Sequence, residues 1–235
     1  MDQFEPARAK SARLYAGLRA GIISGRMRPG EGMSETRLAE QHGISRTPVR
    51  EVLRRLTEEG FLRVVPQIGT FVAPINLTAV KDSQFIRETL ECRAVRLVAD
   101  KITPDQLDLL RAHLDRQEKT IAGGDRAGFF ASDEAMHRDL MRIAEHPSVW
   151  DLVASVKAQL DRVRYLSLED DDWLSMIFGQ HNEIIDSIAA GDADRAERTM
   201  QAHLRTVFGA IERIAEVHAE FFAQERAPQP EQEIA

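Results

Sequence analysis

Residues 37–56, RLAEQHGISRTPVREVLRRL, determine how the N-terminal part of this chain folds. The stretch predicts two short helices joined by a tight turn, because its apolar residues are spaced to bury one face of each helix against the other. Gly43 marks the turn, since glycine adopts a positive φ without steric cost. Ser45 then takes an N-cap position, and Pro48 falls in the first turn of the second helix, where its missing N–H is harmless. The apolar residues are Leu38, Ala39, Ile44, Val49, Val52, Leu53 and Leu56.

The second of these helices has the features of a recognition helix. Arg46, Thr47 and Arg50 project from its N-terminal end, which meets base edges and phosphates in a helix-turn-helix. An ordinary helical hairpin with surface arginines is the alternative. Two short β-type runs follow, at residues 61–65 and 69–73, and they predict a hairpin with Gly69 at its tip. The order of elements therefore favours a winged helix-turn-helix.

The charge distribution is consistent with DNA binding but does not establish it. The net charge of −7 argues weakly against a nucleic-acid partner. Residues 1–76, however, hold 12 Lys and Arg against 8 Asp and Glu, whereas the rest of the chain holds 19 against 30. A basic head on an acidic body suits a DNA-binding domain attached to another domain, although solvated helix faces produce such differences by chance.

The run SETRLAEQHGISRTPVREVLRRLTEEGFLRVVPQIGTFVAP, residues 34–74, resembles the DNA-binding domain of GntR-family transcription regulators, and the resemblance extends over residues 8–75. It implies that Ser45, Arg46 and Arg50 contact operator bases and phosphates, and that Gly69 lets the wing approach the minor groove. Some relatives carry an arginine at the position of Thr36; Arg37 is the nearest arginine here and is the candidate for that phosphate contact.

The remainder of the chain reads as helix, so the fold class is mainly α: an N-terminal winged helix-turn-helix plus a C-terminal antiparallel six-helix bundle. The six expected helices span residues 78–101, 104–122, 125–144, 147–167, 172–190 and 192–223. We expect a DNA-binding domain at residues 1–75, a helical domain at 76–225, and a disordered tail at 226–235, which is polar and contains proline.

Four ionisable side chains fall on the apolar stripes of three of these helices. Asp133 and His137 lie four residues apart on one stripe, and His181 and His203 lie on two others. Burial of an unpaired carboxylate is costly, and one shared divalent cation would satisfy the whole set. An Asp and three His suit zinc, nickel or another first-row ion. For each histidine alone, a satisfied core position or a surface position is the alternative; we interpret His42, His113, His146 and His218 as surface residues.

The bundle resembles the FCD effector domain of FadR-type GntR regulators. The similarity rests on DEAMH at 133–137, on HNEIIDSIAAGD from His181, and on MQAHL, which contains His203. The resemblance implies a divalent metal at Asp133, His137, His181 and His203, with a small organic acid as effector beside it. Six bundle helices would indicate the VanR-like branch of these regulators.

Arg87 is the candidate effector-binding residue, since a guanidinium can bind a carboxylate through two hydrogen bonds. The alternative is an internal ion pair with Glu91, four residues along the same helix. Arg162 and Arg164 are weaker candidates, which we expect on a solvated face.

No apolar run approaches the ~20 residues that cross a bilayer, and the N-terminus lacks a signal-peptide pattern. The single cysteine, Cys92, suits a reducing compartment, so we expect a cytoplasmic protein without chemistry at this thiol.

Together with the resemblances, these patterns predict a homodimeric regulator, not an enzyme, that binds double-stranded operator DNA. The family resemblance implies repression that is relieved by a small carboxylate beside the metal. The two-fold symmetry of a dimer would match a palindromic operator. Two alternatives stay open. One is a DNA-binding regulator with a purely structural metal and no effector. The other is a metal-dependent hydrolase, in which the ion activates water.

Overall fold

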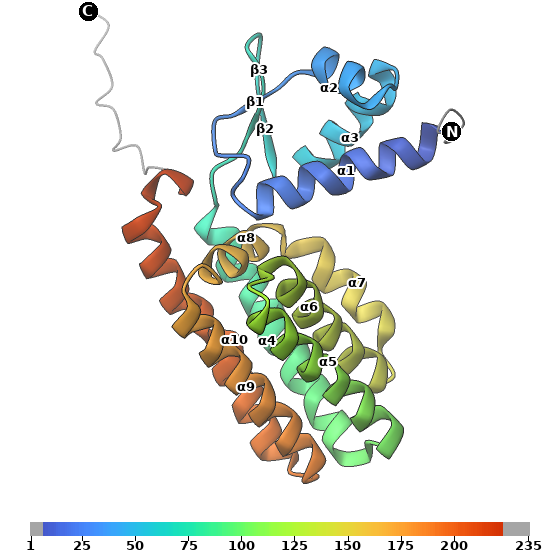
Figure 1. Ribbon diagram of the computed structural model, residues 1–235, viewed down its shortest axis with the longest axis vertical. Helices are drawn as coiled ribbons and strands as arrows, with labels where there is room; N and C mark the ends of the chain where they lie inside the picture. Colours follow the sequence, from blue (N-terminus) through green and yellow to red (C-terminus); the bar gives the residue numbers. More distant parts are fainter. Residues whose placement is uncertain (1–6, 223–235) are drawn as a thin grey trace, which may run out of the picture.

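The computed structural model describes residues 7–222 and has two parts (Figure 1). We call the first part, α1 to β3, the head, and the second, α4 to α10, the bundle. The head lies at one end of the long bundle helices. Its elements are α1 (Ala7–Ile23), β1 (Gly32–Met33), α2 (Glu35–His42), α3 (Arg46–Glu58), β2 (Leu62–Val65) and β3 (Gly69–Val72). The mainly helical fold class is confirmed.

Local signals in the sequence set the helix ends of the head. Ser34 caps α2, because its side chain accepts a hydrogen bond from Arg37 N–H. Gly43 ends α2 with φ 58°, as its conformational freedom predicted. Ser45 is the N-cap of α3, but its hydroxyl makes no capping hydrogen bond. The three helices close on a core formed by residues such as Leu18, Val49 and Leu56.

The wing belongs to a three-stranded antiparallel sheet of order β1-β3-β2. β2 and β3 form the predicted hairpin, with Val65 opposite Gly69. Gly69 is therefore the first residue of β3 and not the tip of the wing; the turn residues 66–68 form the tip, where Gln67 adopts φ 61°. The two-residue strand β1, which the sequence did not predict, pairs with β3.

The bundle contains seven helices within residues 7–222, where the sequence predicted six. They are α4 (Leu77–Lys101), α5 (Pro104–Ala122), α6 (Arg126–Ile143), α7 (Pro147–Val156), α8 (Ala158–Ser167), α9 (Asp171–Ala189) and α10 (Ala193–Val217), followed by the short 3-10 helix η1 (Ala219–Phe221). The expected helix 147–167 is two helices, which meet at Lys157. Ser83 Oγ of α4 donates a 2.7 Å hydrogen bond to the Val156 carbonyl at this break. The six-helix basis for the VanR-like branch is therefore wrong.

The last helix ends at Val217, six residues earlier than predicted, and the chain then turns back along the segment that joins head and bundle. Ile75 N–H donates a 2.7 Å hydrogen bond to Phe221 O, and Ile75 is buried. The domain limits at residues 75 and 225 stay predictions, and the predicted disordered tail lies outside the described residues. Within residues 7–222, every helix is too short or too polar to span a bilayer.

Candidate metal and DNA-binding sites

A layer of buried polar side chains divides the apolar core of the bundle. On α6, Phe129 belongs to the core cluster near the head and Leu140 to the cluster at the far end, with Asp133 and His137 between them. The same arrangement recurs on α9, where His181 lies between Ile177 and Ile184. We call this layer the polar layer: Gln84, Arg87, Glu91, Gln117, Asp133, His137, His181 and His203, all buried.

The four predicted metal ligands meet in the polar layer. One potential ligand atom from each of Asp133, His137, His181 and His203 lies within 4.8 Å of all the others. Asp133 Oδ1 lies 3.0 Å from His181 Nε2 and 3.5 Å from His137 Nε2. Neither contact has hydrogen-bond geometry, so both buried nitrogens lack a hydrogen-bond partner among residues 7–222. Metal–ligand distances of about 2.0–2.2 Å require only small side-chain movements from this arrangement. The buried cluster could therefore hold a metal ion.

A second set of side chains lies beside Nδ1 of the three imidazoles: His181 and His203 form hydrogen bonds there, whereas the contact of His137 with Glu91 is an ion pair without hydrogen-bond geometry. His137 Nδ1 lies 2.5 Å from Glu91 Oε2, His181 Nδ1 lies 2.8 Å from Gln117 Oε1, and His203 Nδ1 lies 3.1 Å from Gln180 Oε1. An acceptor at Nδ1 favours the tautomer whose Nε2 lone pair is free, the usual arrangement around a bound metal. These partners of the ligands were not predicted from the sequence. Glu91 and Gln117 were detectable only as polar residues on buried stripes.

The electrostatics favour the neutral form of two histidines and the charged form of the carboxylate. Burial would lower the pKa of His137, but Glu91 and Asp133 outweigh it and raise that pKa. Burial lowers the pKa of His181, and burial together with the neighbouring histidines lowers the pKa of His203 well below its usual value. Burial would raise the pKa of Asp133, but Arg164 and the two imidazoles outweigh it and hold that pKa well below its usual range. A neutral imidazole and an ionised carboxylate are the forms that bind metal.

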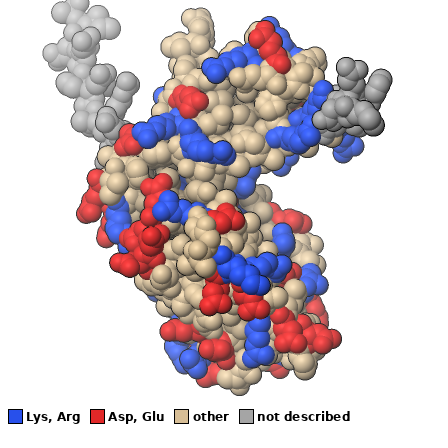
Figure 2. Space-filling view, in the orientation of Figure 1, with Lys and Arg blue, Asp and Glu red and all other residues tan. Residues whose placement is uncertain are grey.

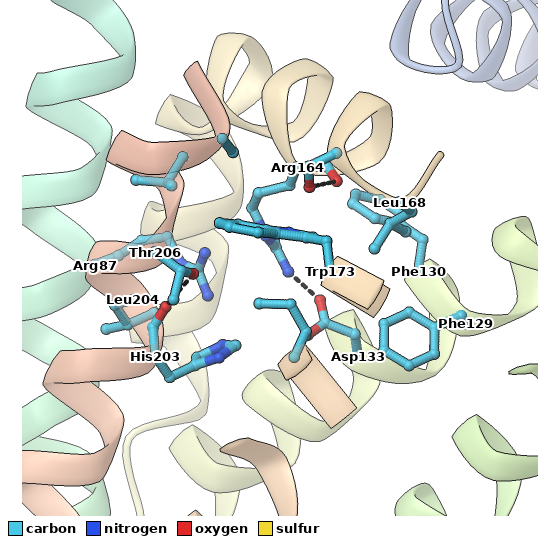
Figure 3. Close-up of a pocket in the computed structure, with 14 residues that line it drawn as sticks. Arg87, Phe129, Phe130, Asp133, Arg164, Leu168, Trp173, His203, Leu204 and Thr206 are labelled. Carbon is cyan, nitrogen blue, oxygen red and sulfur yellow. Dashed lines mark hydrogen bonds and ion pairs between the residues drawn. The ribbon is translucent and has the colours of Figure 1, made fainter. Parts of the chain in front are cut away.

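A pocket adjoins the polar layer (Figure 3). Arg87 and His203 point into it from one side, and Phe129, Phe130 and Leu168 line the opposite side. Arg87 also forms the internal pair that the sequence left open, with Nε 2.6 Å from Glu91 Oε1. Arg87 therefore forms the internal ion pair with Glu91 and also lines the pocket.

The prediction that Arg164 lies on a solvated face is wrong. Arg164 is 14% exposed, lines the pocket, and pairs with the metal-ligand candidate Asp133 through Nη2. Arg162 is fully buried, and burial lowers its pKa to about 10. His113 is likewise buried and not on the surface, with Nε2 2.8 Å from Asp139 Oδ2. Arg164 and His113 have partners on another helix, and Arg162 donates to Ala73 O in the segment after β3; helix periodicity alone does not reveal such partners.

The predicted DNA-binding residues all lie on the exposed surface of the head. Arg37, Ser45, Arg46, Thr47, Arg50 and Gly69 are all exposed. Arg46 and Arg50 both form ion pairs with Glu35 of α2, at 3.1 and 3.0 Å. In the face shown in Figure 2, most of the acidic side chains lie on the bundle. A DNA phosphate would compete with Glu35 for these two arginines.

Helix α8 connects the pocket to the head. On the side of α8 that faces the head, Gln159 Nε2 donates to Gly60 O at 2.5 Å and Arg162 Nη1 donates to Ala73 O at 2.7 Å. Asp161 accepts a 3.0 Å hydrogen bond from Arg19 of α1. Arg164, on the same helix, contacts both Asp161 and Asp133. The polar layer and the head are therefore joined through the side chains of one ten-residue helix.

A winged helix-turn-helix on a helical bundle with a buried Asp/His cluster defines a class of DNA-binding transcription regulators. Residues 10–72 match the family model of bacterial regulatory proteins of the gntR family, and residues 82–206 match that of the FCD domain. The chain belongs to the GntR family, in the FadR-like subfamily with a C-terminal FCD domain.

Several relatives match nearly the whole chain. An HTH-type transcriptional regulator in an unstable DNA locus of Streptomyces ambofaciens is 39% identical over 92% of this chain and 91% of its own. The HTH-type transcriptional repressor RspR of Escherichia coli K12 is 31% identical over 95% of this chain and 98% of its own. These relatives are transcription regulators and not enzymes, which confirms that prediction and removes the hydrolase alternative.

Solved structures share the fold. A GntR regulator from Rhodococcus sp. RHA1 has a TM-score of 0.73 and 23% identity, covering 87% of this chain and 98% of that one. E. coli McbR/YncC also has a TM-score of 0.73, at 20% identity, covering 87% and 97%.

Proposed function

We propose that this protein is a cytoplasmic, homodimeric repressor whose operator affinity changes when a small carboxylate binds beside a divalent metal in the bundle. The observation that supports this most is the four-ligand cluster, which adjoins a pocket and is connected to the head by α8. The relative RspR is named as a repressor, which favours repression as the sign of regulation.

Asp133, His137, His181 and His203 would hold the metal, and zinc or nickel suits this donor set. A bound divalent ion would supply a positive centre that attracts an anionic oxygen. Arg87, which lines the pocket from the α4 side, would then donate to the same anion. The four ligand roles and that of Arg87 are our assignments.

The signal would pass to the head through α8. An anion beside Asp133 would change the charge around Arg164, whose guanidinium also contacts Asp161. Asp161 is fully buried and binds Arg19 of the head. An effector changes DNA affinity only by its different affinity for two arrangements of the heads. The contacts of α8 provide a path by which those arrangements could differ.

On the head, Arg46, Thr47 and Arg50 of α3 would read the operator in the major groove, with Ser45 and Arg37 on phosphates. The hydroxyl of Ser45 is free for this contact because it does not cap α3. Gly69, at the base of the wing turn, would allow the wing backbone to approach the minor groove.

An exposed aromatic surface on the bundle supports the homodimer. Phe85 of α4 is 73% exposed and Phe208 of α10 is 42% exposed. Both line a groove whose charged residues have both signs, including Lys81, Glu88, Arg93 and Arg205. A two-fold interface needs a self-complementary patch of this kind. Light scattering should give a dimer for the native chain and a monomer for Phe85→Glu. Met176→Glu, on exposed α9 surface, serves as the control.

Native mass spectrometry of protein purified without chelator tests the metal and effector together. One divalent ion per chain, with a carboxylate that alters operator affinity, supports the sensor. If no carboxylate changes the operator affinity and the protein unfolds when the metal is chelated, the structural-metal alternative is supported instead. A chain that takes up neither zinc nor nickel would contradict the site.

A further inference from the structure

The lining of the pocket beside the polar layer indicates which class of carboxylate the pocket would bind. This inference rests on the proposed function. The two sides of the pocket differ in chemistry (Figure 3). The side next to the metal-ligand candidates carries Arg87, Asp133 and His203. The remaining lining is mostly apolar and consists of Phe129, Phe130, Leu168, Trp173, Ile177, Leu204, Val207 and Ala210, together with Arg164 and the hydroxyl residues Ser167 and Thr206.

Both arginines of the pocket already have carboxylate partners within the chain. Arg87 Nε and Nη2 lie 2.6 and 3.3 Å from the two oxygens of Glu91. Arg164 contacts Asp133, Glu134 and Asp161. Arg87 or Arg164 could therefore bind a second carboxylate of the ligand only if one of these internal ion pairs breaks.

A second carboxylate would also have to lie against the mostly apolar wall, because the hydroxyls of Ser167 and Thr206 already donate to the main-chain carbonyls of Arg164 and His203. Phe129 and Val207 are buried, and their side chains offer no hydrogen bond. Burial of a charged group without a partner is strongly unfavourable. An apolar end, in contrast, gains from contact with the same wall.

The pocket is small, in addition to having one charged side and one mostly apolar side. Its cavity volume is about 40 Å³, room for about three water-sized groups. Trp173 helps to close it: the indole is 9% exposed and Arg213 stacks on it at 3.6 Å from the ring centroid. A ligand with a six-membered ring would require Trp173 to move.

We propose that the effector is a short monocarboxylate, and not a dicarboxylate, whose apolar end beyond the carboxylate has roughly one to three carbons, the number of water-sized groups that the cavity holds. The single carboxylate of the ligand lies at the side of the pocket that carries Arg87 and His203, and the apolar end of the ligand contacts Phe130 and its neighbours.

Isothermal titration calorimetry on the zinc-loaded full chain tests this, after zinc uptake has been measured. Butyrate and succinate share a four-carbon skeleton, and we expect butyrate to bind at least tenfold more tightly. Benzoate, which tests the size limit, should bind at least tenfold more weakly than butyrate. Equal or tighter binding of succinate would overturn the charge part of the proposal, and tighter binding of benzoate would overturn the size part.

Two substitutions of the half-buried Phe130 sharpen the test. Phe130→Lys supplies a cation on the apolar wall and should bring the affinities for succinate and butyrate within about twofold of each other. Phe130→Leu, the matched control, should preserve the preference for butyrate. An unchanged preference in Phe130→Lys would contradict the role of this wall. If zinc binds but acetate, propionate, butyrate and succinate all fail to bind, carboxylate sensing itself is refuted, and not only this refinement of it.

Discussion

Replacement of Gln117 by Met should weaken metal binding without direct change to a ligand. Gln117 is fully buried, and its Oε1 lies 2.8 Å from His181 Nδ1. Met has a similar volume but offers no comparable acceptor, so the imidazole proton is free to move to Nε2, where it must be displaced before metal binds. Loss of such a partner typically lowers metal affinity 10- to 100-fold, about 1.4–2.8 kcal/mol.

The effect on thermal stability follows by mass action. At free zinc equal to about 100 times the native Kd, zinc stabilises the native chain by about 2.7 kcal/mol. At the same free zinc, the variant should gain only about 0.4–1.4 kcal/mol. For a chain of this size each kcal/mol corresponds to roughly 2–4 °C in Tm. The metal-free variant should melt close to the native chain, because Gln117 Nε2 is itself a buried group without a partner among the described residues.

Zinc competition against a chromogenic chelator gives the affinities, and melts with and without zinc give the Tm shifts. Gln201→Met, the same change on α10 at a residue bonded to Glu88, is the matched control and should behave as the native chain. A zinc affinity of Gln117→Met within twofold of native would refute the assignment of Gln117 as the residue that orients His181.

Three further outcomes are expected. Arg46→Ala should weaken operator binding and lower the salt slope by about one; fluorescence anisotropy at several salt concentrations measures both, and an unchanged slope argues against a phosphate contact. Burial lowers the pKa of His113, so its stabilising contribution is present above the unfolded pKa of about 6.5 and is lost as pH falls below it. Metal-free His113→Gln should therefore lose less Tm than the native chain between pH 7 and 5, and an equal loss would contradict this sign. Arg19→Gln should reduce the effector-induced change in operator affinity by roughly fivefold, since it removes the 3.0 Å contact with Asp161, whereas Arg26→Gln should leave that change intact.

The features that the sequence predicted well are those set by local interactions. Gly43 ends α2 because of its own backbone freedom, and Ser34 caps the same helix through a residue three positions on. The clustering of Asp133, His137, His181 and His203 was also predictable, because each lies on the buried stripe of a long, regular helix. Helical periodicity gives the face of a residue but not its partner.

The features that the sequence missed depend on contacts between distant segments. The break between α7 and α8 has no Gly or Pro, and the Ser83 hydroxyl that accompanies it comes from α4. Arg164 was assigned to solvent because its partner Asp133 lies on a different helix. Strand β1 is two residues long and exists through its pairing with β3. None of these contacts leaves a periodic pattern.

The way in which α8 contacts the head has a consequence for the evolution of such regulators. Gln159 and Arg162 donate to the main-chain carbonyls of Gly60 and Ala73, which every residue type supplies. Substitutions among the side chains of the head can therefore change the operator that is read and leave these two contacts in place. A head with new DNA specificity would remain connected to the same sensor, so the recognition and sensing functions of the chain can diversify separately.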